Sequence, residues 1–282
     1  MRKKSAPQSR AATQIDYFCQ TFGTSALVNA DANYLMQIKI GCCGFPVAKE
    51  RYYKYFDLVE IQQTFYQLPQ EKTVYKWREQ APPDFEFTLK AWQLITHPPS
   101  SPTYRRLKQV IPEARKEDYG FFKATEEVFK AWEETEKIAQ ILKARIIVFQ
   151  CPASFRPAPE NKGNLEKFFK AIKRKNFIFV WEPRGRWERE EISNLCEKLN
   201  LLPCLDPFKS EIPPEAAEKP FPGKVGYFRL HGKAGYRYKY TDSDLKELKA
   251  LAKGFNTVYF MFNNVHMFED ALRFKQKIIK RV

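Results

Sequence analysis

The sequence is poor in the two residue types that most often bind metals or form cross-links. It contains three histidines and six cysteines in 282 residues. No two cysteines are separated by the two residues that zinc ribbons and dithiol redox motifs require, and Cys42 and Cys43 are adjacent, which favours neither a local disulfide nor a shared metal site. We therefore expect reduced thiols in a cytoplasmic protein.

Long apolar stretches and acidic residues are also scarce. No uninterrupted apolar run approaches the roughly 20 residues needed to cross a bilayer, so we expect no membrane partner. Lys and Arg number 48 against 33 Asp and Glu, which gives a net charge of +15. This surplus favours an anionic partner, either nucleic acid or a phosphorylated small molecule, because clustered cations displace counterions from phosphates. The alternative is a chain whose charged surface serves solubility and surface ion pairs.

Short apolar runs that end in a charged or amide side chain are abundant. About eight occur between residues 38 and 266: IKIGCC, LVEIQQ, FEFTLKAW, ARIIVFQ, FIFVWEPR, LLPCLD, VGYFRLHG and TVYFMFNN. Most are separated by charged stretches long enough for a helix, the pattern of alternating β and α units around a parallel sheet. Eight units predict a single α/β domain, a closed (β/α)8 barrel of the TIM type, since such barrels commonly span about 250 residues.

The chain divides into a basic start and one barrel. The first fourteen residues carry four cations, Arg2, Lys3, Lys4 and Arg10, and no acid. Such a composition is typical of flexible tails. We predict a flexible extension over residues 1–36 and a barrel domain over residues 37–282, whose late units are irregular because the stretch after LLPCLD is rich in proline.

Alternation along the apolar runs assigns the two faces of each strand, because side chains two residues apart share a face. Helices must cover an apolar outward face, whereas the inward face can be polar at the carboxyl end. Val59 and Ile61 are thus predicted to point outward and Glu60 inward. The polar inward side chains converge on one mouth of the barrel. The full inward set is Glu60, Gln62, Thr88, Lys90, Val148, Gln150, Glu182, Asp206, Tyr227, Arg229, His231, Met261 and Asn263.

All three histidines, His97, His231 and His266, lie at or just beyond predicted strand ends. Each also fits a histidine that forms a hydrogen bond at a loop entry. His231 is the strongest catalytic candidate because Arg229 precedes it by two residues on the same inward face.

The segment HGKAGYRYKY, which begins at His231, combines two glycines with Lys233, two further cations and three tyrosines. Barrels of this type often bind phosphate after strands seven and eight, and glycines let backbone N–H groups approach oxygen atoms closely. Aromatic side chains between cations also suit stacking on bases. The alternative is a solvated edge whose tyrosines keep their hydroxyl groups in water.

Three inward carboxylates, Glu60, Glu182 and Asp206, suit general acid or base chemistry if neighbouring cations tune their pKa values. They equally suit a buried ion-pair network that closes the mouth. Glu182 and Asp206 with His231 also have the right ligand types for a divalent metal. No close ligand spacing such as HxxxH supports a metal, so we predict no cofactor and keep a divalent metal as an alternative.

Several segments of the chain resemble the YecE-like family, known as domain of unknown function seventy-two. They are IGCCGF, LVEIQQTFYQLP, TVYKWREQAPPDFEFTLKAWQLITH, VWEPRGRW, RLHG and FNNVH, and the resemblance spans about residues 38–282. It implies a TIM-like barrel with no settled reaction. Family members commonly have Asn at the position of Gln62 and His at that of Gly185, so a mechanism that uses that histidine is not expected here. By position, the recurrent residues are Glu60, Phe65, Tyr66, Lys90, His97, Gln150, Pro152, Glu182, Arg184, Trp187, Arg229, His231, Gly232, Asn263 and Asn264.

These observations predict a hydrolase or lyase that acts on a phosphate-bearing or nucleic-acid substrate at the carboxyl-terminal mouth of the barrel. The alternatives are a noncatalytic nucleic-acid or nucleotide binder and an enzyme of sugars or small acids with an incidentally basic surface. The predicted catalytic residues are Glu182, His231, Glu60 and Asp206, and the predicted substrate-binding residues are Lys90, His97, Gln150, Arg184, Arg229, Lys233, Asn263 and Asn264.

Overall fold

A computed structural model describes residues 36–209 and 225–279 of the chain. Its eight parallel strands close into a barrel in which each strand pairs with the next and β8 pairs with β1. The predicted (β/α)8 barrel is confirmed. The strands are β1 (Gln37–Cys43), β2 (Leu58–Ile61), β3 (Glu86–Lys90), β4 (Ile146–Gln150), β5 (Ile178–Glu182), β6 (Leu202–Leu205), β7 (Val225–Leu230) and β8 (Thr257–Phe262).

Two predicted features fall largely or wholly outside the described residues. The extension predicted over residues 1–36 is described at Met36 alone, and the proline-rich stretch after β6 is described to residue 209. In the parts of the chain that are described, no helix is both long and apolar enough to span a membrane.

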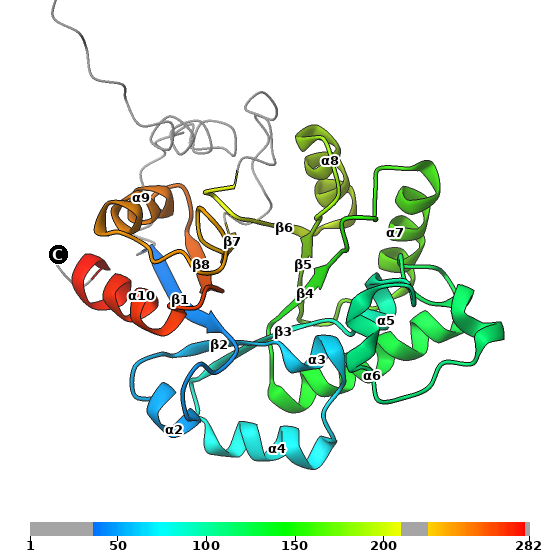
Figure 1. Cartoon of the computed structure of the whole chain (residues 1–282), viewed down its shortest axis with the longest axis horizontal. Helices are drawn as coiled ribbons and strands as arrows, with labels where there is room; N and C mark the ends of the chain where they lie inside the picture. Colours follow the sequence, from blue (N-terminus) through cyan, green and yellow to red (C-terminus); the bar gives the residue numbers. More distant parts are fainter. Residues whose placement is uncertain (1–35, 210–224, 280–282) are drawn as a thin grey trace, which may run out of the picture.

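Helices surround the strands (Figure 1). Those with at least seven residues are α4 (Glu71–Gln80), α6 (Glu126–Leu142), α7 (Pro159–Ala171), α8 (Arg189–Leu199), α9 (Asp242–Ala252) and α10 (Met267–Arg273). Shorter turns are α2 (Lys49–Tyr52), α3 (Gln63–Tyr66), α5 (Gln93–Thr96), the 3-10 helices η1 (Pro102–Arg106) and η2 (Glu113–Asp118), and a π-helical turn, η4 (Phe274–Ile279).

Aromatic side chains fill the layer between the strands and the helices. Trp132 of α6 packs against Phe149 of β4 and Phe179 of β5, with ring centroids 5.8 and 5.4 Å apart. Phe168 of α7 lies against the same Phe149 at 6.0 Å. Phe149 therefore faces outward, as the alternation predicts. The apolar spacing from Phe122 to Leu142 in the sequence predicts one helical stripe that includes Phe122. Phe122 instead precedes α6 with a φ of 54°, because the helix begins after the N-cap Thr125.

The barrel interior is polar at positions that alternate with this outer layer. The hydroxyl groups of Thr88 and Tyr227 lie 3.0 Å apart, although β3 and β7 are not neighbours in the sheet. The two side chains can meet only across the barrel, so both point inward as predicted.

The sequence predicts two closing helices, over Lys246–Phe255 and Glu269–Arg281. The structure has α9 and α10 near these positions, with different ends. The first begins at Asp242 rather than at residue 246, because Thr241 and Asp244 form a reciprocal capping box at its start. The second was predicted over residues 269–281, and α10 ends at Arg273, where the π-helical turn begins.

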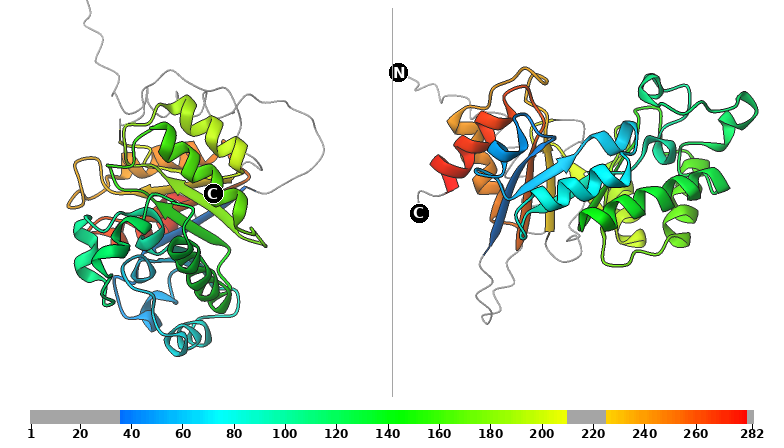
Figure 2. Two further views of the ribbon diagram at one scale, coloured as in Figure 1. Left: turned by 90° about the vertical axis from the view of Figure 1, so that its right-hand side faces the viewer. Right: turned by 90° about the horizontal axis from the view of Figure 1, so that it is seen from below.

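The segment between α5 and α6 projects from one end of the molecule (Figure 2). Its base is fixed at His97, whose carbonyl oxygen accepts a hydrogen bond from the Tyr104 hydroxyl at 2.8 Å. Gly120 packs on the same backbone, since a Cβ there would lie 2.4 Å from the His97 oxygen. The base of this segment is therefore tied to the loop that follows β3.

Candidate functional site

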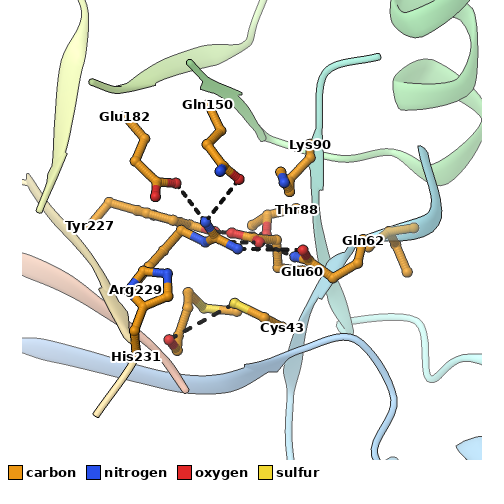
Figure 3. Close-up of polar contacts among 12 residues, drawn as sticks. Cys43, Glu60, Gln62, Thr88, Lys90, Gln150, Glu182, Tyr227, Arg229 and His231 are labelled. Carbon is orange, nitrogen blue, oxygen red and sulfur yellow. Dashed lines mark hydrogen bonds and ion pairs between the residues drawn. The ribbon is translucent and has the colours of Figure 1, made fainter. Parts of the chain in front are cut away.

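Arg229, on β7, lies at the centre of a buried ion-pair cluster that crosses the barrel (Figure 3). Its side chain is 1% exposed. One terminal nitrogen donates to Oε2 of Glu182 at 2.5 Å, and Nε lies 3.1 Å from Oε1 of Glu60. Longer contacts of 3.4 Å reach the side-chain oxygens of Gln150 and Gln62. We call these five residues the Arg229 cluster; it joins β7 to β5, β4 and β2.

Charges in and beside the Arg229 cluster determine the protonation states of Glu182 and Arg229. Burial alone would raise the pKa of Glu182, but Arg229 and Arg184 hold that pKa well below its ordinary value. Burial likewise acts to lower the pKa of Arg229, and Glu182 and Glu60 outweigh it, so the pKa lies well above its usual range. Glu182 therefore remains a carboxylate near neutral pH, which suits electrostatic positioning better than proton transfer.

Glu60 lies in the interior rather than at an accessible surface. It is fully buried, accepts a hydrogen bond from the Tyr227 hydroxyl at 2.8 Å and contacts the Gln62 amide. It is not part of the cavity wall described below. These contacts fit a residue that holds Arg229 in place. They do not place Glu60 at the surface of the cavity.

His231, the residue after β7, forms a dyad with Asp206, the residue after β6. Oδ2 of Asp206 lies 3.1 Å from Nδ1 of His231 and accepts its backbone N–H at 2.9 Å. Nε2 of His231 lies 3.3 Å from a terminal nitrogen of Arg184. A guanidinium has no acceptor, so in this contact Nε2 accepts and the ring proton resides on Nδ1, facing Asp206. The Nε2 lone pair is thus directed at Arg184.

A cavity of about 270 Å³ lies at the carboxyl ends of β5, β6 and β7. Arg184 is an accessible cation of this cavity: its side chain is 35% exposed, and Nε donates to Oε1 of Glu182 at 3.0 Å. This cavity combines a positive group with a histidine whose proton position is fixed. Its charged and hydrogen-bonding side chains are Glu182, Arg184, Asp206, Lys209, Arg229, His231, Tyr236 and Trp187.

Lys90 and His97 lie beside the cluster around the ring of Phe65. The Lys90 ammonium is 3.7 Å from the ring centroid, and none of the described carboxylates forms an ion pair with it. Burial, with Arg229, lowers the pKa of Lys90 to about 7. His97, 4.8 Å from the same ring, donates to or accepts from the Thr96 hydroxyl at 2.8 Å. Burial, with Lys90 and Arg184, lowers its pKa to about 3, so His97 is neutral.

Three predicted binding residues belong neither to the Arg229 cluster nor to the wall of the cavity. Lys233 pairs with Asp244 at 2.5 Å and Glu247 at 3.4 Å, both on α9. Asn264 donates to Asp270 and to the carbonyl oxygen of Tyr238. Asn263 is half-buried, and its backbone N–H donates to the Leu230 oxygen at 2.9 Å. The charge of Lys233 is therefore used within the fold and not directed at the cavity.

Tyr236 and Gly185 shape the cavity and were not among the predicted site residues. The Tyr236 ring packs edge-on against His231 at 5.6 Å, and its place in the segment HGKAGYRYKY was the available signal. A Cβ at Gly185 would lie 2.3 Å from the Phe155 carbonyl oxygen, which also accepts the Trp187 indole N–H at 2.7 Å. Glycine at position 185 thus lets the loops after β4 and β5 pack together.

Replacing Gly185 by alanine should destabilise the protein by about 1–3 kcal/mol, because the added methyl group overlaps a backbone oxygen. Gly163 is a matched control: it lies in α7, and beyond the backbone of its own helix and its chain neighbours no atom lies within 4 Å of the position that a methyl group would take there. Gly163→Ala should therefore be neutral or stabilise by up to about 1 kcal/mol. Urea unfolding of the two variants measures both effects. Equal free energies of unfolding would contradict the tight loop contact.

The metal alternative finds no support in the side-chain geometry. In residues 36–209 and 225–279, no group of three or more His, Cys, Asp or Glu side chains is arranged to hold a metal ion. Glu60 and Glu182 instead bind the guanidinium of Arg229, which lies between them.

Comparison with known proteins agrees with the fold. A family model described as protein of unknown function DUF72 matches residues 49–282. A DUF72 family protein from Thermotoga maritima is 21% identical, with 85% of this chain and 98% of that chain covered and a TM-score of 0.60. One from Enterococcus faecalis is 18% identical, with 86% and 98% covered and a TM-score of 0.62. An AP endonuclease of family 2 from Brucella melitensis is 8% identical, with 82% and 93% covered and a TM-score of 0.50. No curated protein matches the chain.

Proposed function

This chain belongs to the DUF72 family of proteins of unknown function, and from that premise we propose that its barrel catalyses an acid–base cleavage, a hydrolysis or lyase-type reaction, of a phosphate-bearing substrate. The arrangement of Asp206, His231 and Arg184 around one cavity carries the proposal. Asp206 orients the imidazole and fixes its proton on Nδ1, which leaves Nε2 as the basic atom.

Arg184 is suited to bind the anionic group of the substrate. It is a partly exposed cation of the cavity, and Glu182 holds its Nε at 3.0 Å. A phosphate oxygen that takes the terminal N–H groups of Arg184 replaces their contact with His231. Nε2 is then free to take a proton from water or from a substrate hydroxyl group, and to return it to the leaving group.

The Arg229 cluster supports Arg184 and His231. Its member Glu60 does not contact the substrate. Arg229 anchors Glu182 at 2.5 Å, and Glu182 in turn orients Arg184. Lys209 lines the same cavity, with its ammonium 5.9 Å from the Tyr236 ring centroid, and adds positive charge to it. These cations favour phosphate over a neutral sugar.

A noncatalytic nucleic-acid binder is the second candidate, and the net charge of +15 favours it. The two candidates differ in what His231 does. A binder needs cations but no oriented imidazole, whereas the proposed enzyme needs the imidazole for turnover and can bind without it.

Replacing His231 by glutamine or Asp206 by asparagine is expected to lower turnover by about 10²–10⁴-fold. Release of nitrophenolate from bis(p-nitrophenyl) phosphate measures turnover, and the anisotropy of a fluorescein-labelled single-stranded oligonucleotide measures binding, which should change less than about twofold. His266→Gln is the control, because His266 also lies near a carboxylate, 3.8 Å from Glu269, but outside the cavity. Equal turnover in the wild type and His231→Gln, or no turnover in the wild type, would favour the binder.

A further inference from the structure

A second, larger cavity of about 1050 Å³ adjoins the 270 Å³ cavity, which we call the His231 cavity or inner cavity. It lies between the loops that follow β4 and β5. The two cavities share Ala153, Arg184, Gly185 and Trp187 in their walls. We call the larger one the arginine groove. Because Arg184 belongs to both walls, a ligand bound at the inner cavity can extend into the arginine groove without leaving the surface.

Two exposed arginines, Arg156 and Arg186, line the arginine groove in addition to Arg184. Neither forms an ion pair with an acidic side chain of residues 36–209 or 225–279. The acidic residue in the wall is Glu188, whose backbone N–H donates to Glu191 at the start of α8. Positive charge thus exceeds negative charge in the wall, and the two outer guanidinium groups are available to an anion.

The floor between these arginines is closely packed. Trp187 is 3% exposed, donates its indole N–H to the Phe155 carbonyl oxygen and packs on the Phe155 ring at 5.6 Å. Gly185 adds no side chain above this floor, since a Cβ there has no room. The passage between the two cavities is therefore bounded by closely packed groups.

We infer that the arginine groove binds the flanking phosphates of a single-stranded nucleic acid whose reacting phosphate occupies the His231 cavity. The inference rests on the proposed function, since it takes the inner cavity as the reaction site. An inner cavity of about 270 Å³ suits one phosphate-bearing group, whereas about 1050 Å³ has room for further nucleotides. Arginine, with its planar fork of donors, binds phosphate oxygens in pairs.

The double variant Arg156→Gln/Arg186→Gln tests the groove. Binding of fluorescein-labelled (dT)12 is followed by anisotropy from 50 to 300 mM salt. Loss of two phosphate contacts should lower the slope of log affinity against log salt by about 1.4, at about 0.7 for each contact with a single strand. The dissociation constant at low salt should rise by about tenfold or more. Binding of dTMP, which needs the inner cavity alone, should stay within about twofold.

Lys72→Gln/Lys76→Gln is the matched control. Both lysines are exposed, line a separate groove on α4 and form no ion pair with the described acidic residues, so the change in net charge is the same. An equal loss of slope in this control, or an unchanged slope in the arginine variant, overturns the inference. An equal loss of affinity for dTTP and (dT)12 also overturns it, because the groove would then bind a short polyphosphate.

Failure of the inference and failure of the proposed function give different results. Bis(p-nitrophenyl) phosphate is too small to need the arginine groove, so its turnover should be unchanged in Arg156→Gln/Arg186→Gln and lost in His231→Gln. Retained turnover in His231→Gln counts against the proposed function. Unchanged (dT)12 binding in the arginine variant counts against the groove alone.

Discussion

Arg229→Met should destabilise the protein by about 3–5 kcal/mol, because removal of one partner leaves the other charges of a buried network uncompensated. Glu60 is fully buried and Glu182 is 8% exposed at its side chain, and both lie against the Arg229 guanidinium. Methionine keeps much of the length of the arginine side chain but supplies no charge. Urea unfolding at pH 7 measures the loss.

The pH dependence of this variant provides a second test. In the wild type the pKa of Glu182 is held below its ordinary value, so its contribution to stability is full above the unfolded pKa and is lost as the pH falls through the folded pKa. Without Arg229, burial acts on Glu182 with less opposition and its pKa rises. The variant should therefore lose stability as the pH rises from about 4.5 to 7, where Glu182 is fully ionised in the wild type and contributes no slope.

A double variant separates lost charge compensation from a packing defect. Arg229→Met/Glu182→Gln removes one of the two stranded carboxylates, so it should recover about 1–3 kcal/mol relative to Arg229→Met alone. If Arg229→Met costs less than about 1 kcal/mol, or if the second change recovers nothing, the cluster is not a network of mutually compensating charges.

Lys90→Met should stabilise the protein at neutral and mildly acidic pH, by up to about 5 kcal/mol below pH 7. Burial, with Arg229, lowers the pKa of Lys90 from 10.5 to about 7, so the folded state disfavours the charged amine. Between these values the unfolded chain binds more protons than the folded one, and wild-type stability rises with pH by up to about 1.4 kcal/mol per unit. Methionine retains an apolar contact with the Phe65 ring.

The measurement for Lys90 is the slope of the free energy of unfolding from pH 7 to pH 10. Lys90→Met should have a flatter slope than the wild type, and Lys54→Met, a change of the same type at an exposed lysine, should keep the wild-type slope. Equal slopes in the wild type and Lys90→Met would show that Lys90 stays charged in the folded protein. A charged amine at this buried position would need an anion beside it to offset the cost of desolvation.

The strand faces could be predicted from the sequence because they follow from a local rule. Alternation assigned Thr88, Tyr227 and Arg229 to the interior, and the contact between the Thr88 and Tyr227 hydroxyls confirms two of those assignments. Strand order needed no long-range information, since every strand pairs with the next.

The partners of the charged side chains could not be predicted, because they depend on which atoms the closed barrel brings together. The sequence predicts both Lys233 and Arg184 as substrate-binding residues. Lys233 meets Asp244 and Glu247 on α9, a helix that follows it closely in the chain, and Arg184 meets Glu182 and His231. The role of Gly185 depends on the approach of the Phe155 carbonyl oxygen, which no pattern around Gly185 indicates.

The position of Arg229 also constrains the order in which the barrel can be completed. Its carboxylate partners belong to β2 and β5, whereas Arg229 belongs to β7. During synthesis the ribosome releases β2 and β5 first, and until residue 229 emerges their carboxylates have no guanidinium from β7. Burial of unpaired charges is costly, so the nascent half-barrel has reason to stay open and hydrated at its centre. Closure of the ring and neutralisation of its interior are thus coupled, since both require β7.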